Sequence, residues 1–536
     1  MNHIPKKKIV PAIIDRRGYV FRKKCASPEL VNLINNELIV KPTLNTDYKV
    51  AEYFKVYTED DENYYLPIYW ALDNIDLNYE PVINYKYKSK NSIDFKFKGV
   101  LRAPQDEIIN TMIKIFYDSE KCSLRPYASS IISCRTGGGK TVLALYIMSF
   151  IKRRTIIFCH TSSLYQQWIE RISDYIDGAK IGCIQGDKIN IKGNNIVIAM
   201  IQTVMTGKLD YSELIKDFDF VIYDECHHMG AKVFSSVMRQ IQPPYSLGLS
   251  ATVVRDDKLD KVFKWSLGEV GYITLGSLDY NIAIQIYKFS IVDNPKFKML
   301  VNRFTKKTNI SKMMVNLTEI NQRNDLIIKI IQNIFKQSPS RHLVVISNFV
   351  DHLVKLKEKL DPLFINQVGL YTGNALKDIQ KKMKKQSDQA PDLIKELESK
   401  QILLATSKIM EEGVDIRDLD TIMLVTPKAK IIQSCGRILR RLKHEYENIP
   451  LIIDINDTLS IFNGMSRKRI AQYKEKYLIS KGSSLEYYKY DNDTNFNIEF
   501  DYSVNLTSLQ NQDKNKISNP VNLKVDYKKM FDSDSE

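Results

Sequence analysis

A glycine-rich turn followed by lysine and threonine is the first feature of the sequence that could do chemistry. In SSIISCRTGGGKTVLALYIMSF an apolar run precedes three glycines, and Lys140, Thr141 and a helix-like segment follow. Glycines let successive backbone N–H groups curl around a phosphate chain, and the next helix directs its positive end at the same anion. The lysine can reach the β- and γ-phosphates, and the threonine hydroxyl can ligate Mg²⁺. The pattern predicts a phosphate loop made of Arg135, Thr136, Gly137, Gly138, Gly139, Lys140 and Thr141.

The second chemical feature is FVIYDECHH, residues 220–228, in which a hydrophobic run meets two acids, a cysteine and two histidines. A metal site, a buried strand end and the acidic half of a nucleotide pocket are the three interpretations. Adjacent histidines on an extended chain face opposite sides, so His227 and His228 do not make a metal site. Asp224 at the strand end can hold Mg²⁺ through water, and Glu225 can polarise an attacking water. We therefore interpret the stretch as a strand with a catalytic acidic edge.

Short β-branched runs alternate with amphipathic segments on both sides of these features. The first set of predicted strands is SSIISC, TIIFC, NIVIAM, FVIYD and SLGLS, and the second is HLVVIS, NQVGLYTG, QILLAT, TIMLVT and PLIIDI. Between them, SLYQQWIERISDYI places Leu164, Trp168, Ile172 and Tyr175 on one helical face. This alternation predicts two tandem α/β units, each with a parallel sheet covered by helices.

At this point the chain resembles a known family. CRTGGGKT, DECHH and SAT (residues 250–252) are similar to motifs I, II and III of superfamily 2 helicases. The resemblance implies two RecA-like domains that use ATP and Mg²⁺, with His227 linking the nucleotide site to motif III. LRAPQDEII implies that Gln105 contacts adenine. MIQTV and CHTSSLYQQW imply nucleic-acid contacts by Thr203 and Thr161, although His160 replaces the usual proline before that threonine.

The second half of the chain carries two further motifs of the family. IIQSCGRILRR has the pattern Q-x-x-G-R-x-x-R, with Gln433, Arg437 and Arg440. On a helix the two arginines share a face and could aim at one phosphate, although a solvated basic helix end is the alternative. ATSKIMEEGVDIRDLDTIMLVTP resembles motif V. It implies that Gly413 and Asp415 lie near the nucleotide, and Thr406 and Ser407 near a backbone phosphate.

Some stretches are similar to one branch of the superfamily. SATVVRDDK resembles the XPB-type run S/T-A-T-x-x-R-E-D, with Asp256 in place of glutamate, and INQRNDLI and LSIFNGMSRKRIAQYKEKYLI also resemble this branch. Its members are ATP-driven translocases on DNA. The Asn, Lys, Ile and Tyr-rich composition is similar to helicases of large cytoplasmic DNA viruses, and poxviral relatives release transcripts from elongating RNA polymerase, which implies polymerase as a partner.

The charge and the cysteine content indicate which kind of partner and which cellular compartment to expect. The 536 residues include 78 Lys and Arg against 63 Asp and Glu, which gives a net charge of +15. This charge favours a polyanionic partner, and the alternative is that it serves only to keep the protein soluble. RKRIAQYKEK is one basic segment that could follow a nucleic-acid backbone or be a solvated helix face. Seven scattered cysteines fit a reducing compartment, and no apolar run approaches the ~18 residues that span a bilayer. We expect a soluble intracellular protein, located in the host cytoplasm and the virion if it is viral.

The predicted organisation has four parts. Residues 1–98 form an α+β accessory section for DNA or partner binding, residues 99–280 the first RecA-like domain, residues 281–483 the second, and residues 484–536 a flexible tail. The predicted function is that of an ATP-dependent DNA helicase or translocase in transcription. The alternatives are an RNA helicase or duplex-RNA translocase, a DNA-repair helicase, and a binding scaffold without turnover.

Overall fold

The computed structural model describes residues 12–42, 52–75, 81–85, 93–134, 138–206, 216–253, 257–273, 281–302, 306–376, 378–379, 393–411, 416, 418–429, 431–439, 445–477, 483–490 and 498–504. The chain divides into two compact units. The first contains Met1–Gly276, Lys408–Arg417 and Leu439–Arg441, and the second contains Ser277–Ser407, Asp418–Ile438 and Leu442–Glu536. None of the helices in these described ranges is long and apolar enough to cross a membrane.

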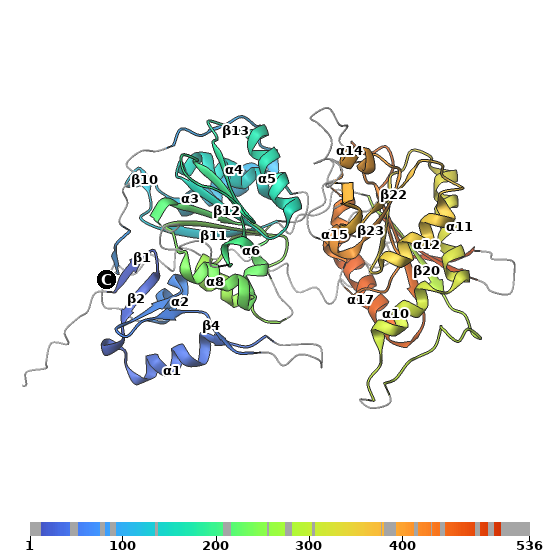
Figure 1. Ribbon diagram of the computed structural model, residues 1–536, viewed down its shortest axis with the longest axis horizontal. Coiled ribbons are helices and arrows are strands. Elements are labelled where there is room, and N and C mark those ends of the chain that lie inside the picture. The colour runs from blue at the N-terminus through green and yellow to red at the C-terminus, as the bar shows by residue number, and fades with distance from the viewer. Residues whose placement is uncertain are drawn as a thin grey trace, which may run out of the picture. The chain divides into compact units, whose positions relative to one another are not determined.

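The first unit is built on an eight-stranded sheet with the order β15-β14-β16-β12-β17-β18-β11-β19 (Figure 1). Its strands are β11 (Ala128–Ser133), β12 (Thr155–Cys159), β14 (Ile181–Gln185), β15 (Lys188–Asn190), β16 (Ile196–Met200), β17 (Phe220–Tyr223), β18 (Tyr245–Ser250) and β19 (Val270–Ile273). All neighbours are parallel except β14 and β15. The predicted parallel α/β arrangement of this unit is confirmed.

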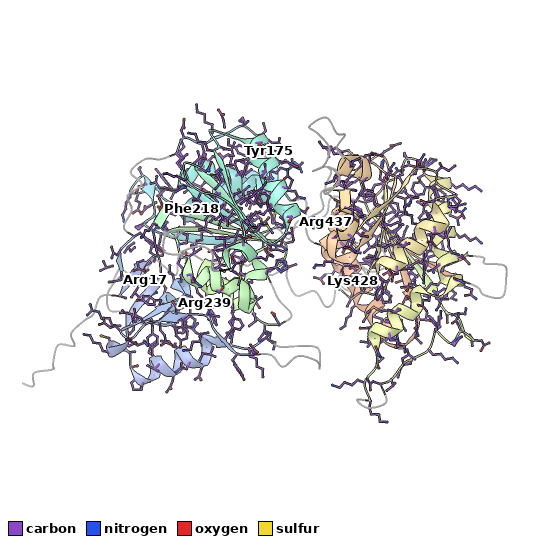
Figure 2. All side chains as sticks on the ribbon, in the orientation of Figure 1. Arg17, Tyr175, Phe218, Arg239, Lys428 and Arg437 are labelled. Atoms are coloured by element: carbon purple, nitrogen blue, oxygen red, sulfur yellow. The ribbon has the colours of Figure 1, made fainter. Side chains whose placement is uncertain are left out.

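Helices cover this sheet because their apolar stripes must be buried. They include α3 (Ala103–Phe116), α4 (Lys140–Ile151), α5 (Ser162–Tyr175), α8 (Lys232–Gln240) and α9 (Asp260–Leu267). In α5 the predicted face is confirmed, since Leu164, Trp168 and Ile172 are all buried. The fourth member, Tyr175, is half-buried and stacks on Phe97 with ring centroids 5.8 Å apart (Figure 2).

The N-terminal section packs onto this α/β unit. Strands β1 (Ile13–Asp15), β2 (Gly18–Arg22), β5 (Thr58–Glu59), β6 (Asn63–Leu66) and β7 (Val82–Ile83) form its sheet, beside helices α1 (Pro28–Glu37) and α2 (Ile68–Asn74). A hydrophobic cluster joins the section to Leu259 and Val262 near α9. Arg16 adds an ion pair to Asp219 at 2.6 Å. These contacts make the section a layer of the first unit.

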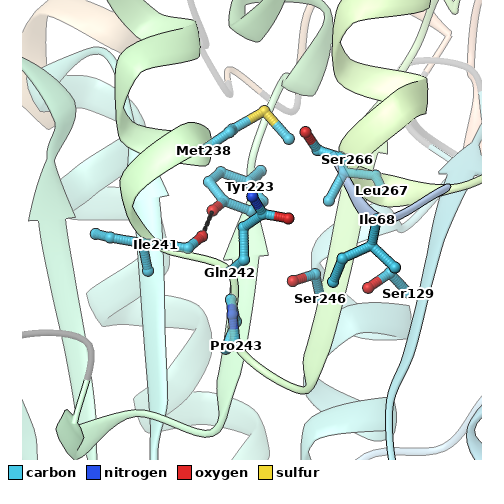
Figure 3. A pocket seen from close by; sticks show the side chains of 10 residues that line it. All are labelled: Ile68, Ser129, Tyr223, Met238, Ile241, Gln242, Pro243, Ser246, Ser266 and Leu267. Atoms are coloured by element: carbon cyan, nitrogen blue, oxygen red, sulfur yellow. Dashed lines mark hydrogen bonds between the residues drawn. The ribbon is translucent and has the colours of Figure 1, made fainter. Parts of the chain in front are cut away.

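A small pocket lies where this layer meets the larger sheet (Figure 3). Ile68 of α2 faces Gln242 and Tyr223 across it, and the Tyr223 hydroxyl donates to the Ile241 carbonyl at 3.2 Å. Close to the pocket, Gln242 Nε2 donates to the Arg17 carbonyl at 3.3 Å, and Arg239 of α8 donates to the Lys55 carbonyl. Polar and apolar contacts therefore both attach the section.

The second unit repeats the parallel design with the order β22-β23-β21-β24-β25-β20-β26-β27. Its strands are β20 (Ala283–Phe289), β21 (Leu343–Ser347), β22 (Val368–Tyr371), β23 (Ile402–Thr406), β24 (Thr421–Leu424), β25 (Leu451–Asp457), β26 (Ser484–Tyr490) and β27 (Ile498–Val504). The helices include α10 (Ile310–Thr318), α11 (Asn321–Gln337), α12 (Val350–Leu360) and α17 (Ser460–Lys476). All neighbouring strands are parallel except β26 and β27, so the second predicted parallel sheet is confirmed as well.

The start of the expected flexible tail is ordered, which corrects the prediction for that part. β26 pairs in parallel with β20, and β27 pairs antiparallel with β26. Leu485 and Tyr487 alternate on the buried face of β26, and the Tyr488 ring stacks on Tyr287 with centroids 4.7 Å apart. The polar composition concealed this period-two pattern. Residues 505–536 lie outside the described part.

Two buried arginines fix the helices of the second unit to its sheet. Arg323 of α11 makes two hydrogen bonds to the Asp457 carboxylate, at 2.7 and 2.8 Å, and Arg469 of α17 makes the same pair to Asp454 at 2.8 Å. Each arginine is at most 2% exposed. Arg469 belongs to the basic segment RKRIAQYKEK. It is therefore a structural residue and cannot contact a nucleic acid.

A buried histidine should make the second unit sensitive to acid. His352 of α12 hydrogen-bonds Ser347 and Asn324, and burial lowers its pKa to about 3. The unfolded chain takes up a proton near pH 6.5, whereas the folded chain stays neutral, so the free energy of unfolding falls as the pH drops below about 6.5. We expect a loss on the order of 2 kcal/mol between pH 7 and pH 5. Chemical denaturation at both pH values measures it.

A His352→Gln variant is the control, because its amide retains a donor and an acceptor and does not titrate. Its stability should change less between the two pH values. Hydrogen exchange in β21 and α12 assigns the change to this unit, and an equal pH dependence in the two proteins would contradict the prediction.

Candidate ATP-hydrolysis site

Three neighbouring strands of the first unit end where the predicted chemical residues begin. The order β17-β18-β11 places them side by side, and parallel pairing puts their carboxyl ends at one edge of the sheet. The glycine-rich loop follows β11, residues 251–252 follow β18, and the acidic turn follows β17. Ligands of open α/β sheets bind outside this edge. Arg135, Thr136 and Gly137 lie outside the described residues.

Lys140 and Glu225 come together at this edge. Lys140 is the first residue of α4, preceded by Gly139 as N-cap with a φ of +82°. Its Nζ lies 3.8 Å from Glu225 Oε1 and donates to the Cys134 carbonyl at 3.3 Å. Thr141 follows in the first turn of the same helix. The predicted phosphate-binding and acidic residues are thus neighbours in space.

Gln105 contacts the glycine-rich loop directly. Its Oε1 accepts from the Arg102 backbone N–H at 2.9 Å, which closes the N-terminus of α3. Its Nε2 donates to the Gly138 carbonyl at 3.4 Å, and the side chain is buried. The contact with adenine stays a prediction, and the structure adds a role for this side chain in supporting the loop.

The acidic turn is held tightly. Asp224 Oδ1 accepts from the Glu225 N–H at 2.9 Å, and Oδ2 accepts from Trp168 Nε1 at 2.9 Å. Burial and the charge of Glu225 raise the pKa of Asp224 to about 6, while Trp168 and Lys140 oppose this rise. Glu225 itself has a φ of +48°, a left-handed conformation that is costly for a non-glycine residue and occurs at functional sites.

Trp168 is the functional contact that the sequence analysis missed. The helical pattern placed it on an apolar face, which is where its ring lies. The available signal was chemical, because a buried indole N–H usually finds a hydrogen-bond partner. Helical periodicity could not identify that partner, since Asp224 lies 56 residues further along the chain.

Three histidines lie beside the acidic turn. His227 Nδ1 lies 2.9 Å from Ser250 Oγ and 3.3 Å from Glu225 Oε2, so this ring connects the ends of β17 and β18. The His228 ring lies between those of His227 and His160, with centroids 4.2 Å apart in both pairs and the ring planes tilted by 35° and 47°. Burial lowers the pKa of His160 to about 4, so this ring is neutral at pH 7.

The two predicted nucleic-acid contacts of the first unit follow neighbouring strands. Thr161 after β12 is the N-cap of α5, and its Oγ1 accepts from the Leu164 N–H at 3.3 Å. Thr203 after β16 accepts from the Gly186 N–H at 2.9 Å. Gln202 Nε2 donates to the His160 carbonyl at 2.7 Å and ties the two segments together. Both threonines therefore lie at the same sheet edge as Lys140.

The site residues expected in the predicted second RecA-like domain, 281–483, are only partly described. Thr406 ends β23, and Ser407 Oγ donates to Asn348 Oδ1 at 2.6 Å. Arg437 lies in a short 3-10 helix, Gly436–Ile438, and is buried (Figure 2). Gln433 lies in α16 (Ile432–Cys435), without a described side chain. The residues outside the described part are Gly413, Asp415 and Arg440. The paired arginines stay a prediction.

The close approach of the loop to Gln105 is testable by substitution. A Cβ on residue 139 would lie 2.2 Å from Gln105 Nε2, at a positive φ. We expect Gly139→Ala to lower the free energy of unfolding by about 2–4 kcal/mol, from the clash and the left-handed backbone together. In a Gln105→Ala background only the backbone cost of about 1–2 kcal/mol should remain. Chemical denaturation of the unaltered chain, the two single variants and the double variant measures the cost of Gly139→Ala in each background. Equal costs in the two backgrounds would show that a Cβ on residue 139 does not clash with Gln105.

Comparison with known proteins places this geometry in a family. Residues 98–255 match the family model described as "Type III restriction enzyme, res subunit". A protein of Acanthamoeba polyphaga mimivirus, named as an ATP-dependent RNA helicase, is 32% identical over 87% of this chain and 86% of its own length. A protein of Invertebrate iridescent virus 6, named as a helicase, is 26% identical over 74% and 85%. The DNA 3′–5′ translocase XPB2 of Sulfurisphaera tokodaii is 31% identical over 43% and 46%. Together with the two parallel sheets and the site at the edge of the first of them, these similarities show that the chain belongs to the superfamily 2 helicases, which hydrolyse ATP in dependence on nucleic acid.

Proposed function

We propose that this chain is an ATP-driven DNA helicase or translocase that serves viral transcription. The observation that carries the proposal is the convergence of Lys140, Glu225 and His227 at the carboxyl edge of one sheet, with 3.8 Å between the lysine and the glutamate. A lysine and a carboxylate at that separation can hold a triphosphate and a water molecule respectively. The rest of the proposal concerns the polynucleotide.

The residues of the first unit divide the hydrolytic work. Lys140 neutralises the β- and γ-phosphate oxygens, and Glu225 orients the attacking water and accepts its proton. The hydroxyl of Thr141 and the carboxylate of Asp224, acting through water, are the hard oxygen donors that Mg²⁺ prefers, so this donor set fits that ion. Mg²⁺ bound there supplies charge neutralisation at the phosphates. His227 contacts both Glu225 and Ser250 and so fixes the position of the Glu225 carboxylate relative to the end of β18.

Residues of the predicted second RecA-like domain, 281–483, contribute the remaining groups in this proposal. Arg437 and Arg440 stabilise the charge on the transferring phosphoryl group, and Gln433 orients the γ-phosphate. Gly413 and Asp415 are proposed to contact the nucleotide. Hydrolysis would be coupled to movement by a change of conformation between the ATP-bound state and the state after hydrolysis.

Backbone contacts suit a motor that travels along its substrate. Thr161 and Thr203 in the first unit, and Thr406 and Ser407 in the second, are proposed to bind phosphates, which carry no sequence information. The net charge of +15 favours such contacts. Similarity to a DNA translocase supports DNA. RNA is the second candidate, because the mimivirus relative is named as an RNA helicase.

A place in transcription, with an elongating RNA polymerase as the partner, is proposed from the resemblance of the sequence to poxviral helicases that release transcripts. Transcript release from a stalled polymerase, compared between the intact chain and a Lys140→Ala variant, tests this placement. Equal release by both proteins would remove the transcription proposal and leave the ATPase proposal intact.

Removing either central side chain should abolish stimulated hydrolysis. We expect Lys140→Ala and Glu225→Gln to lower the polynucleotide-stimulated kcat by roughly 10²–10⁴-fold, because each removes a group that acts on the reacting phosphate or water. Polynucleotide binding should persist. Lys114→Ala, on the exposed face of α3, is the control and should keep full activity. Normal turnover in either site variant would contradict the proposed mechanism.

The identity of the polynucleotide can be decided by stimulation of ATP hydrolysis. We expect duplex DNA to raise kcat more than duplex RNA of equal length and sequence, measured at one fixed salt concentration because phosphate contacts depend strongly on salt. Single-stranded DNA and single-stranded RNA are tested under the same conditions. Stronger stimulation by duplex RNA would favour the second candidate, and failure to hydrolyse ATP with any polynucleotide would leave only a binding scaffold.

A further inference from the structure

Helix α5 spans the distance between a proposed nucleic-acid contact and the metal-binding carboxylate. Thr161 caps its N-terminus, and Trp168 lies seven residues later, about 10 Å along the axis of the helix. Trp168 Nε1 donates to Asp224 Oδ2 at 2.9 Å. One rigid element therefore connects the segment that faces the polynucleotide with the carboxylate that faces the nucleotide.

The hydrogen bond from Trp168 controls the orientation of Asp224. The other oxygen of Asp224 accepts from the next residue of its own turn, so it gives no attachment to a distant element. Trp168 is 1% exposed and its ring lies in the main hydrophobic cluster of the first unit. Because close packing prevents the indole from swinging independently, its N–H moves with the helix. A shift of α5 is thus a shift of the donor that holds Asp224.

A second contact joins the same segment to the far end of the acidic turn. His160 directly precedes Thr161, and its ring lies 4.2 Å from the ring of His228. The His228 ring in turn contacts the His227 ring in a tilted arrangement, and His227 lies 3.3 Å from Glu225 Oε2. The segment 160–168 therefore touches the turn 224–228 at both of its ends, through an indole hydrogen bond and through contacts between imidazole rings.

We infer that residues 160–168 are a positioning element that transmits polynucleotide binding at Thr161 to the acidic turn, with Trp168 and His160 as its two points of contact. This inference rests on the proposed function, since it needs Thr161 to bind the polynucleotide. Neither residue touches ATP. Both act through the orientation of Asp224 and Glu225, and their effect is on the stimulation of hydrolysis by polynucleotide.

The test is Trp168→Phe in the full chain, which removes the N–H and retains most of the ring. We expect the stimulation ratio, the kcat with saturating duplex DNA divided by the kcat without it, to fall about tenfold, as for a lost hydrogen bond to a charged group. The Kd for the DNA should stay within about twofold, because no phosphate contact is removed. A merely structural residue would lower both rates equally.

Trp70→Phe is a matched control. Trp70 is also fully buried and also donates its indole N–H to a carboxylate, Glu37 Oε2 at 2.7 Å, but it lies in the N-terminal section. Its stimulation ratio should equal that of the unaltered chain. His160→Ala is the second test variant should Trp168→Phe fail to fold, and it should lower the ratio severalfold.

The outcomes separate this inference from the proposed function. A chain that responds to duplex DNA and keeps its stimulation ratio in both Trp168→Phe and His160→Ala would overturn the inference alone. An equal loss in Trp70→Phe would also overturn it, because the effect would then be one of general stability. An unaltered chain that hydrolyses ATP without response to any polynucleotide would overturn the proposed function and the inference with it.

Discussion

Parallel pairing of β11, β18 and β17 is the constraint on which the site depends. Adjacent parallel strands end at one edge, so residues separated by more than 80 positions along the chain, such as Lys140 and Glu225, meet 3.8 Å apart. The same edge receives Thr161 after β12 and Thr203 after β16. Both units follow this design, so the strand ends of each unit are where chemistry can be placed.

Buried polar pairs orient the carboxylates at these strand ends. Asp224 after β17 is held by Trp168, and Asp457 at the end of β25 is held by Arg323. In both pairs the donor comes from a helix packed on the sheet, and both partners are shielded from water. A buried carboxylate without such a partner would be costly. Through these pairs, a shift of the helix changes the direction of the carboxylate. A protein that couples hydrolysis to movement needs such a link between a helix and a site residue.

The N-terminal section takes part in the same architecture. Its α2 packs against α9, and α9 packs against the turn Cys226–Gly230 that continues from the acidic residues. The Arg16–Asp219 ion pair attaches the section at the opposite end of β17, just before the strand begins. The strand that carries Asp224 is thereby supported at both ends by residues that the family motifs do not include.

The sequence by itself determined the two α/β units, five of the eight strands in each sheet and the residue types of the site, because period-two and helical patterns and glycine-rich turns are local properties. It also indicated that Lys140 and Asp224 act together, through resemblance to known motifs. Only the tertiary structure decided that Trp168 holds Asp224, that Arg469 is buried and does not form part of an exposed basic surface, and that β26 extends the second sheet. Each of these depends on a partner far away in the chain. Local periodicity contains no information about which distant segment supplies the acceptor of a hydrogen bond or the neighbouring strand at the edge of a sheet.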